Sequence, residues 1–524
     1  MRPQRSAIAV FAAFAMIAVP AGRSAATPYE YLRVGSAIEQ ELRNLDVLGL
    51  GALEGRFRLP RLGTRPLQMI ELQGTSSPVP DSLLDADPLR RFSMIRLERA
   101  LGRDAADEFP PDPRYRSTPR LFQHKSDGQR LEVSTGFAGA VGGDEHDVDV
   151  ADGTGWETAI SLSLDRWLAF SRVTIGNFDS VFAEGIVKNG NLLLMTDESY
   201  IAYTDPRERW NVMFGLNRWH WGPGLEGSLM LSSTAPSMVG LSFRAHLDQL
   251  HMDAIALSAT VRASAGEQLA AHRIEWQPLQ NLRIGVTEAA RYQSPGWQPL
   301  YVVGVIPYVL VQRIQVQAEP DSLDALRNNI LTSADASWRI AEGTRIYGEI
   351  LVDDLHAGSE SNPNKYAFQL GWDGVGRFRR GRLTWNGEST RVTGYVYTSY
   401  FGRDYSLQGD PLGFPVAPDS RRMKLQAAWD VRTDWQLLLQ ALYSDKGEND
   451  LSEPYVPGSG PVNTAVLQGN VENTRQAVGG IRFWPASGVD LTARFGWRWI
   501  DQPLHVKDAR EEGPVGSFEF RIIR

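Results

Sequence analysis

Two hydrophobic periods divide the chain near residue 125. Residues 31–48 and 81–101 carry apolar side chains at mostly helical spacing, which predicts two amphipathic helices. The proline-rich stretch 109–113 cannot continue a helix or lie in a central strand, so it predicts an extended linker. We therefore expect a small helical module with its linker over residues 27–125, and a second body over residues 126–524.

From Leu131 onward the hydrophobic period changes from 3.6 to 2. Residues 159–168, 425–431, 435–443 and 489–499 alternate apolar and polar side chains, which is typical of strands with one apolar face. In the last of these segments leucine, alanine, phenylalanine and two tryptophans share one face, while the opposite face carries arginine. Alternation alone leaves open whether the apolar face packs inside a soluble sandwich or meets lipid in a barrel.

The length of this tract favours the barrel. About 400 residues without an obvious linker are too many for one sandwich, and at ~22 residues per strand and connection they supply roughly 18 strands. Compact connections at 277–281 and 431–434 contrast with longer polar ones at 447–471 and 353–365, as expected for periplasmic turns and surface loops. The predicted fold class is mainly β: a large antiparallel transmembrane β-barrel of about 18 strands, preceded by a small α-helical periplasmic module.

The first 26 residues predict export. Residues 1–5 are basic, residues 7–19 form an apolar run, and Ser24-Ala25-Ala26 offers the small residues that a signal peptidase reads. The apolar run is shorter than the roughly 20 residues that a membrane-spanning helix needs. We expect a signal peptide over residues 1–26, cleaved after Ala26, and a Gram-negative periplasm or outer membrane as the destination.

Composition narrows the chemistry further. The absence of cysteine removes disulfides, thiol nucleophiles and cysteine-ligated metals, and a net charge of −8 offers no basic footprint for nucleic acid. The eight histidines form no His-Glu-x-x-His pattern, and no nucleophile elbow, Walker loop or dinucleotide fingerprint is present. Asp353 and Asp354 are adjacent on a predicted strand, so their carboxylates point to opposite faces. We expect no catalytic residues, no metal, no cofactor and no nucleic-acid partner.

The most specific stretch is residues 214–238, FGLNRWHWGPGLEGSLMLSSTAPSM. Downstream and in order follow YGEILVDD at 347–354, GDPLGFP at 409–415 and APDS at 417–420. In these motifs the chain resembles the Wzi family of capsule assembly proteins over roughly residues 130–500. The resemblance implies an outer-membrane barrel of about eighteen strands, with a small helical bundle on the periplasmic side, that helps to hold capsular polysaccharide at the cell surface in a lectin-like way.

Aromatic and basic residues are the candidate polysaccharide contacts. The run Arg218 to Trp221 sets two indoles that could stack on sugar faces beside a cationic and a titratable side chain, although the tryptophans could equally form a lipid-interface girdle around a Gly-Pro-Gly turn. Arginines clustered beside tryptophan suit the carboxylates of an acidic capsule, although generic lumen charge would also explain them. The candidate residues are Arg218, Trp219, His220, Trp221, Arg377, Arg379, Arg380, Arg382, Trp385, Tyr395 and Tyr397.

The sequence thus favours a non-catalytic outer-membrane protein that binds, and helps to anchor or organise, capsular or surface polysaccharide. Its expected partners are that polysaccharide, outer-membrane lipid and the polysaccharide export machinery, and we expect a monomer. Two alternatives stay open at this point: a diffusion porin or substrate-specific channel, and a barrel enzyme that acts on glycan or lipid.

Overall fold

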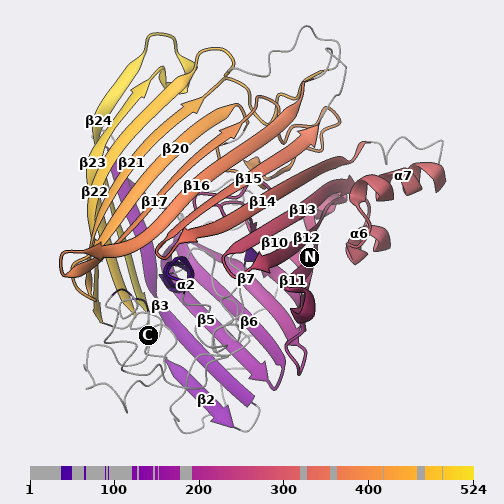
Figure 1. Ribbon diagram of the computed structural model, residues 1–524, viewed down its shortest axis with the longest axis horizontal. Helices are drawn as coiled ribbons and strands as arrows, with labels where there is room; N and C mark the ends of the chain where they lie inside the picture. Colours follow the sequence, from indigo (N-terminus) through magenta and orange to yellow (C-terminus); the bar gives the residue numbers. More distant parts are fainter. Residues whose placement is uncertain are drawn as a thin grey trace, which may run out of the picture.

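The computed structural model describes most of the strand-rich tract and a few segments before it (Figure 1). The described residues are 37–49, 64–65, 89, 93, 121–126, 129–144, 148–151, 153–177, 192–318, 327–354, 363–416, 418–456, 467–486 and 488–523. The expected signal peptide, the proline-rich linker and nearly all of the second expected helix lie outside these residues.

Eighteen long antiparallel strands close into one barrel in the described part of the chain (Figure 1). They are β3 (Gln129–Asp144), β5 (Thr154–Leu164), β6 (Trp167–Asn177), β7 (Leu192–Thr204), β8 (Trp210–Asn217), β10 (Met238–Leu247), β11 (Met252–Arg262), β12 (Glu267–Leu279), β13 (Leu282–Gln293), β14 (Asn329–Ala341), β15 (Thr344–Asp354), β16 (Lys365–Phe378), β17 (Gly381–Val392), β20 (Ser420–Asp430), β21 (Trp435–Lys446), β22 (Glu472–Ala486), β23 (Val489–Asp501) and β24 (Arg510–Ile523). Each long strand pairs with the next one along the chain, and β24 closes the ring on β3. The predicted strand number and antiparallel topology are confirmed.

Short elements complete the fold. The minor strands are β1 (Thr64–Arg65), β2 (Phe122–Ser126), β4 (Val148–Val150), β9 (His220–Trp221), β18 (Ser406–Leu407) and β19 (Asp410–Pro411). The helices are α2 (Ala37–Val47), α6 (Pro299–Val303) and α7 (Tyr308–Ala318), with 3-10 turns η6 (Asp248–Leu250), η7 (Ala263–Ala265) and η9 (Pro503–His505). None of the helices among the described residues is long and apolar enough to cross a membrane.

The connections differ at the two ends of the barrel. At one end, here called the turn end, the strands are joined by compact turns such as 280–281, 342–343 and 379–380. The other end, here called the loop end, carries long connections such as 218–237 and 393–419. In outer-membrane barrels the short turns face the periplasm and the long loops face outward, so the predicted alternation of connection lengths is confirmed.

The two faces of the sheet have opposite character. Outward-facing side chains are large and apolar, as with Phe495 at 69% exposure and Leu439 at 66% exposure. Inward-facing side chains include Arg273 and Arg382, which are at most 1% exposed. A soluble sandwich buries its apolar face, whereas this barrel exposes it and encloses charge, which resolves the alternative that periodicity left open.

One predicted strand has a wrong boundary. The alternation over 159–168 suggests a single strand, but β5 ends at Leu164 and β6 begins at Trp167. Asp165 lies between them with a φ of 53°, a left-handed conformation that aspartate tolerates better than most residues. The alternation of apolar and polar residues continues through this two-residue turn, so the pattern alone does not reveal where one strand ends and the next begins.

Helix α2 is the described part of the first expected helix. It lies against the inward face of the wall at the turn end, where its charged residues are as buried as its leucines: Asp46 is 6% exposed and Leu45 is 2% exposed. An amphipathic helix beside the barrel would expose its polar face, whereas here that face meets charged wall residues. The placement of the other residues of 27–125 stays a prediction.

Candidate functional site: the filled lumen

The connection 218–237, here called the lumen loop, leaves β8 at the loop end and folds into the barrel. Trp221, Leu229 and Met230 are at most 1% exposed, and β9 within this loop pairs with β1, Trp221 opposite Thr64. The turn depends on glycine at 224, because a Cβ there would lie 2.1 Å from the carbonyl oxygen of Gly227. The loop therefore fills the interior instead of covering the rim.

Two wall carboxylates hold the lumen loop by its backbone. Glu388 of β17 accepts hydrogen bonds from the amide nitrogens of Leu225 at 2.8 Å and Glu226 at 3.2 Å. Glu349 of β15 accepts one from the amide nitrogen of Leu229 at 3.0 Å. Each carboxyl group accepts hydrogen bonds from a different part of the loop backbone, so these contacts fix the loop at separate points.

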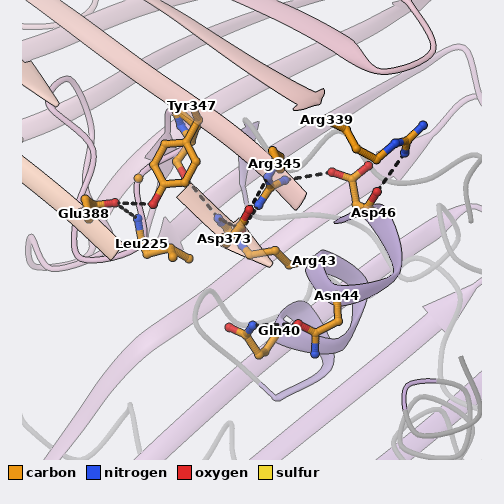
Figure 2. A network of polar contacts seen from close by, with 12 residues as sticks. Gln40, Arg43, Asn44, Asp46, Leu225, Arg339, Arg345, Tyr347, Asp373 and Glu388 are labelled. Atoms are coloured by element: carbon orange, nitrogen blue, oxygen red, sulfur yellow. Dashed lines mark hydrogen bonds and ion pairs between the residues drawn. The ribbon is translucent and has the colours of Figure 1, made fainter. Parts of the chain in front are cut away.

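Neighbouring polar side chains support the same contacts. Tyr347 donates its hydroxyl hydrogen bond to Glu388 at 2.8 Å, beside the backbone of Leu225 (Figure 2). Gln369 donates to Glu388 at 3.0 Å and to the carbonyl oxygen of Gly227 at 3.0 Å. The wall of β15 to β17 thus presents a cradle of hydrogen-bonding groups that matches the backbone of the lumen loop.

Helix α2 is bound to the wall by charge. Asp46 pairs with Arg283 at 2.8 Å. Asp46 also pairs with Arg345 at 2.9 Å, and Arg345 in turn pairs with Asp373 (Figure 2). Burial by itself raises the pKa of the Asp46 carboxyl, but the guanidinium groups of Arg283 and Arg345 outweigh it, so the pKa lies below its usual range. The carboxylate is therefore ionised and locked in an ion-pair network.

Helix α2 and the lumen loop also touch each other. Arg43 donates a hydrogen bond to the carbonyl oxygen of Pro223 at 3.2 Å. Arg65 of β1 donates to the carbonyl oxygen of Gly224 at 3.1 Å and pairs with Glu39 of the helix. The helix, β1 and the lumen loop form one connected plug inside the barrel.

A second connection closes the plug from the loop end. In 393–419 the Tyr397 hydroxyl donates to the carbonyl oxygen of Leu229 and accepts from the amide of Phe414 at 3.2 Å. Tyr397 is fully buried, and burial raises the pKa of its phenol well above the usual range. The phenol stays neutral and joins the two connections as a hydrogen-bonding group.

The structure brings the Arg218 to Trp221 run and Tyr397 together around this plug. Trp219 and Trp221 are 3% and 1% exposed, so they form no girdle at the lipid interface and present no open ring face in this conformation. Burial, with the charges of Arg65 and Arg43, holds the pKa of the His220 imidazole well below its usual range. Their binding to polysaccharide stays a prediction, while their packing inside the plug is observed.

The expected arginine cluster lies at the turn end, where three of its four members are exposed and Arg382 is buried. Arg379 and Arg380 occupy the turn between β16 and β17 at the turn end, and Arg379 lies over the ring of Trp429 at 5.7 Å. Arg382 is fully buried and pairs with Glu41 at 2.7 Å. Arg382 differs from the other three arginines because Glu41, Asp430 and Ser93 enclose its guanidinium.

Two further candidates, Arg377 and Trp385, lie in different environments. Arg377 is exposed near the same turn, whereas Trp385 packs over Gly374, on the face of β17 opposite to the inward Arg382 and Glu388. Trp385 therefore faces lipid, which corrects the expectation that it lies beside guanidinium groups in a glycan site.

At the loop end Tyr395 is partly exposed, with its ring 5.6 Å from that of Tyr455 in an edge-on arrangement. Sequence reasoning missed the neighbouring pair Tyr400 and Phe401, which are 52% and 54% exposed, with the Arg327 guanidinium 5.8 Å from the Phe401 ring. Their only signal is two adjacent aromatic residues in a long polar connection. Glu349 lies within the motif at 347–354, but the motif does not indicate that it binds the lumen loop, and Glu388 lies in no motif.

A closed barrel with an apolar outer face, compact turns at one end and an inward-folded plug defines an outer-membrane β-barrel with a filled lumen. The family model described as capsule assembly protein Wzi matches residues 171–512. The chain belongs to this family, and its location is the outer membrane of a Gram-negative bacterium. No curated protein matches the chain in sequence.

Among solved structures, Wzi of Escherichia coli is described as an outer-membrane, carbohydrate-binding β-barrel involved in group 1 capsule assembly. It shares 14% identity and a TM-score of 0.60, over 93% of this chain and 98% of that one. OprD of Pseudomonas aeruginosa follows with 7% identity and a TM-score of 0.43, over 75% of this chain and 95% of that one. The channel DcaP of Acinetobacter baumannii shares 11% identity with a TM-score of 0.37, over 78% of this chain and 100% of that one.

Proposed function

We propose that this protein is a non-catalytic barrel that binds capsular or surface polysaccharide at its loop end and helps to anchor or organise it there. The observation that carries the proposal is the plug, whose lumen loop is fixed to the wall by Glu349 and Glu388. A filled lumen leaves the loop end as the surface on which a family member of this kind meets extracellular glycan.

Exposed aromatic residues supply the contacts in this proposal. Tyr400 and Phe401 present their rings to solvent, and the Arg327 guanidinium lies beside Phe401. Flat rings are suited to the apolar faces of sugars, and a guanidinium matches the planar geometry of a uronate carboxylate. Among the residues singled out from the sequence, Tyr395 and Arg218 share this end with partial exposure.

The test is polysaccharide retention in cells. A deletion strain that expresses Tyr400→Ala with Phe401→Ala should release polysaccharide that the unmodified protein keeps cell-bound, because the exposed ring faces are lost. Phe378→Ala removes a ring of similar exposure, 43%, at the turn end and should leave retention unchanged. Normal retention by the double variant, with normal insertion, would refute the proposed binding surface.

A conductance measurement distinguishes the proposed filled barrel from the alternative, an open channel. In planar bilayers the unmodified protein should give no stable large conductance, because the lumen loop and α2 occupy the interior. A steady ion current of porin size through the unmodified protein would favour the channel. Association with the polysaccharide export machinery and the monomeric state stay predictions that copurification and sedimentation can test.

A further inference from the structure

The connection between β13 and β14 leaves the loop end and folds back over the outer wall of the barrel. Its helices α6 and α7, residues 299–318 and here called the outer hairpin, lie outside the ring of strands in Figure 1. A Cβ at Gly304, between the two helices, would lie 2.9 Å from the Cβ of Ala256 and 3.3 Å from the Cβ of His272. These two residues are register partners near the middle of β11 and β12. The outer hairpin therefore reaches from the loop end down to the middle of the wall.

The wall beneath the outer hairpin carries outward residues that differ from those around it. Inside the barrel Arg273 donates a hydrogen bond to the Thr287 hydroxyl at 2.9 Å. The pleat therefore turns their neighbours His272 and Glu288 outward, where the Nε2 of the imidazole lies 3.2 Å from the Oε2 of the carboxyl group. The outward positions next to them are alanines with no exposed surface, Ala270 and Ala290. Nearer the turn end, the outward face of the same strands carries large side chains that are 44–50% exposed: Ile274, Trp276 and Val286.

One side of the outer hairpin is packed on this wall. Glu288 accepts hydrogen bonds from the amide nitrogens of Tyr308 at 2.7 Å and Val309 at 3.4 Å, at the start of α7. The first amides of a helix have no partner within the helix, so a carboxyl group of the wall fixes this end. The ring of Tyr301 in α6 stacks on that of Tyr292 in β13, with centroids 4.2 Å apart, and both residues are at most 1% exposed. The small and polar wall positions are thus covered by protein.

The other side of the outer hairpin is apolar and exposed. Its large apolar side chains are between 37% and 78% exposed: Leu300, Val303, Val305, Val309, Leu310 and Ile314. The sequence 299–318 contains one charged residue, Arg313. An exposed apolar surface of this kind marks contact with a membrane or with another protein.

The lipid-facing surface of the barrel continues directly into this exposed side. Phe243 of β10 is the register partner of Ala256, and it is 43% exposed on the outward face. Trp297, which precedes α6, contacts Phe214 of β8 edge-on with ring centroids 6.2 Å apart, and Phe214 is 51% exposed on the same face. The lipid that covers these phenylalanines therefore also meets the outer hairpin.

We propose that the outer hairpin lies in the outer leaflet of the outer membrane, with its exposed apolar side in contact with lipid acyl chains. The Arg313 side chain is long enough to hold its charge among the lipid headgroups while its methylene groups stay in the apolar layer. In this position the hairpin shields His272 and Glu288 from lipid and ties the loop end laterally to the membrane. The proposal does not rest on polysaccharide binding.

Site-directed spin labelling tests the proposal, because a chain without cysteine can be labelled at one chosen position. Val309→Cys in the full chain carries the nitroxide, and the protein is reconstituted in vesicles of phosphatidylcholine and phosphatidylglycerol. The label should collide often with oxygen, which concentrates in lipid, and rarely with a water-soluble nickel chelate. The ratio of the two collision rates should match that of Leu439→Cys on the lipid-facing wall.

Val506→Cys is the matched control, since Val506 lies in a loop-end connection and is 57% exposed, against 48% for Val309. Its ratio of oxygen to nickel collisions should be several-fold lower than that of the Val309 label. Equal ratios at these two positions would place the outer hairpin in water and overturn the proposal. Ile314→Cys, further along α7, provides the same measurement if Val309→Cys fails to assemble.

Protein contact is the other outcome that the labels distinguish. A Val309 label that collides with neither reagent would mean that protein covers the exposed side, which would also overturn the proposal. Dipolar coupling between Val309 labels on separate chains would identify that protein as a second copy.

Discussion

At the scale of single residues, the interior of this barrel is organised by buried arginines with fixed partners. Arg382 has no exposed surface and contacts Glu41 of α2, Asp430 of β20 and Ser93. A buried ion pair adds little net stability over an apolar core, but removing one partner leaves the others buried and unpaired. Substitution of such an arginine therefore destabilises the protein more than the loss of its own interactions would, because its carboxylate partners stay buried and unpaired.

Arg382→Gln should lower the free energy of unfolding by ~3–5 kcal/mol, because Glu41 and Asp430 lose their common cation. Denaturant unfolding in detergent measures the loss. Arg377→Gln is the matched control, since Arg377 lies opposite Arg382 in the strand register but is exposed. Equal stability of the two variants would show that the buried network is not needed.

His220 gives the folded state a pH dependence. Its pKa is lowered by burial and by the charges of Arg65 and Arg43, so the unfolded chain binds the proton first as the pH falls. The stabilisation is fully present above the unfolded pKa of about 6.5 and is lost as the pH falls toward the folded pKa. The unfolding midpoint should be lower at pH 5 than at pH 8, and His220→Asn should reduce that difference.

The control for His220 is His251→Asn. His251 is exposed and has a φ of 51°, a conformation that asparagine accepts, so this change should leave the pH dependence intact. A pH dependence that is identical in His220→Asn and the unmodified protein would assign the effect to other groups.

At the scale of elements, the sequence predicted the strands well and the plug poorly. A strand is defined by its own alternation, so β21 and β23 begin at the residues where the pattern begins, Trp435 and Val489. The inward course of the lumen loop depends on contacts with residues more than 100 positions away, such as Glu349 and Glu388. Local patterns carry no information on such partners, which is why Trp219 was predicted to face sugar or lipid instead of the interior.

Glu388→Ala should loosen the lumen loop. The change leaves the partly buried amide groups of Leu225 and Glu226 without their acceptor, at a cost of at most about 1–3 kcal/mol for each donor. Transient conductance steps should then appear in planar bilayers, because the loop leaves the lumen more often. Glu448→Ala is the control, since Glu448 also accepts a backbone hydrogen bond, from Asn470, but at an exposed position. Equal currents from both variants would contradict this function of Glu388.

At the scale of the whole molecule, the barrel is apolar outside and charged inside, and this inversion sets which substitutions it tolerates. The amino-acid composition did not predict which face of the strands is apolar, because the same fraction of apolar residues is compatible with a soluble sandwich and with a membrane barrel. The length of the tract decided between them, and the structure agrees. The position of the glycan surface was not predictable, because exposure at the loop end depends on how the long connections fold.

Leu439→Arg should block assembly into the outer membrane, because Leu439 faces outward at 66% exposure and a cation at mid-membrane depth costs ~2–4 kcal/mol. Gln440→Arg, one residue along β21, points into the lumen and should be tolerated. The ratio of heat-modifiable folded barrel to unfolded chain on gels measures the difference. Equal assembly of both variants would mean that β21 does not contact lipid.

The joint between β24 and β3 connects the last and the first of the long strands among the described residues. Helix α2 precedes β3 in the sequence yet lies inside the ring, bound to arginines of β13, β15 and β17. The strands that bind the helix pair with their neighbours in sequence, whereas the β24–β3 pairing has the greatest sequence separation and so the highest cost of loop closure. We expect ring closure to be the final event of biogenesis, so a chain cut short in β24 would leave both an open sheet edge and an unenclosed helix.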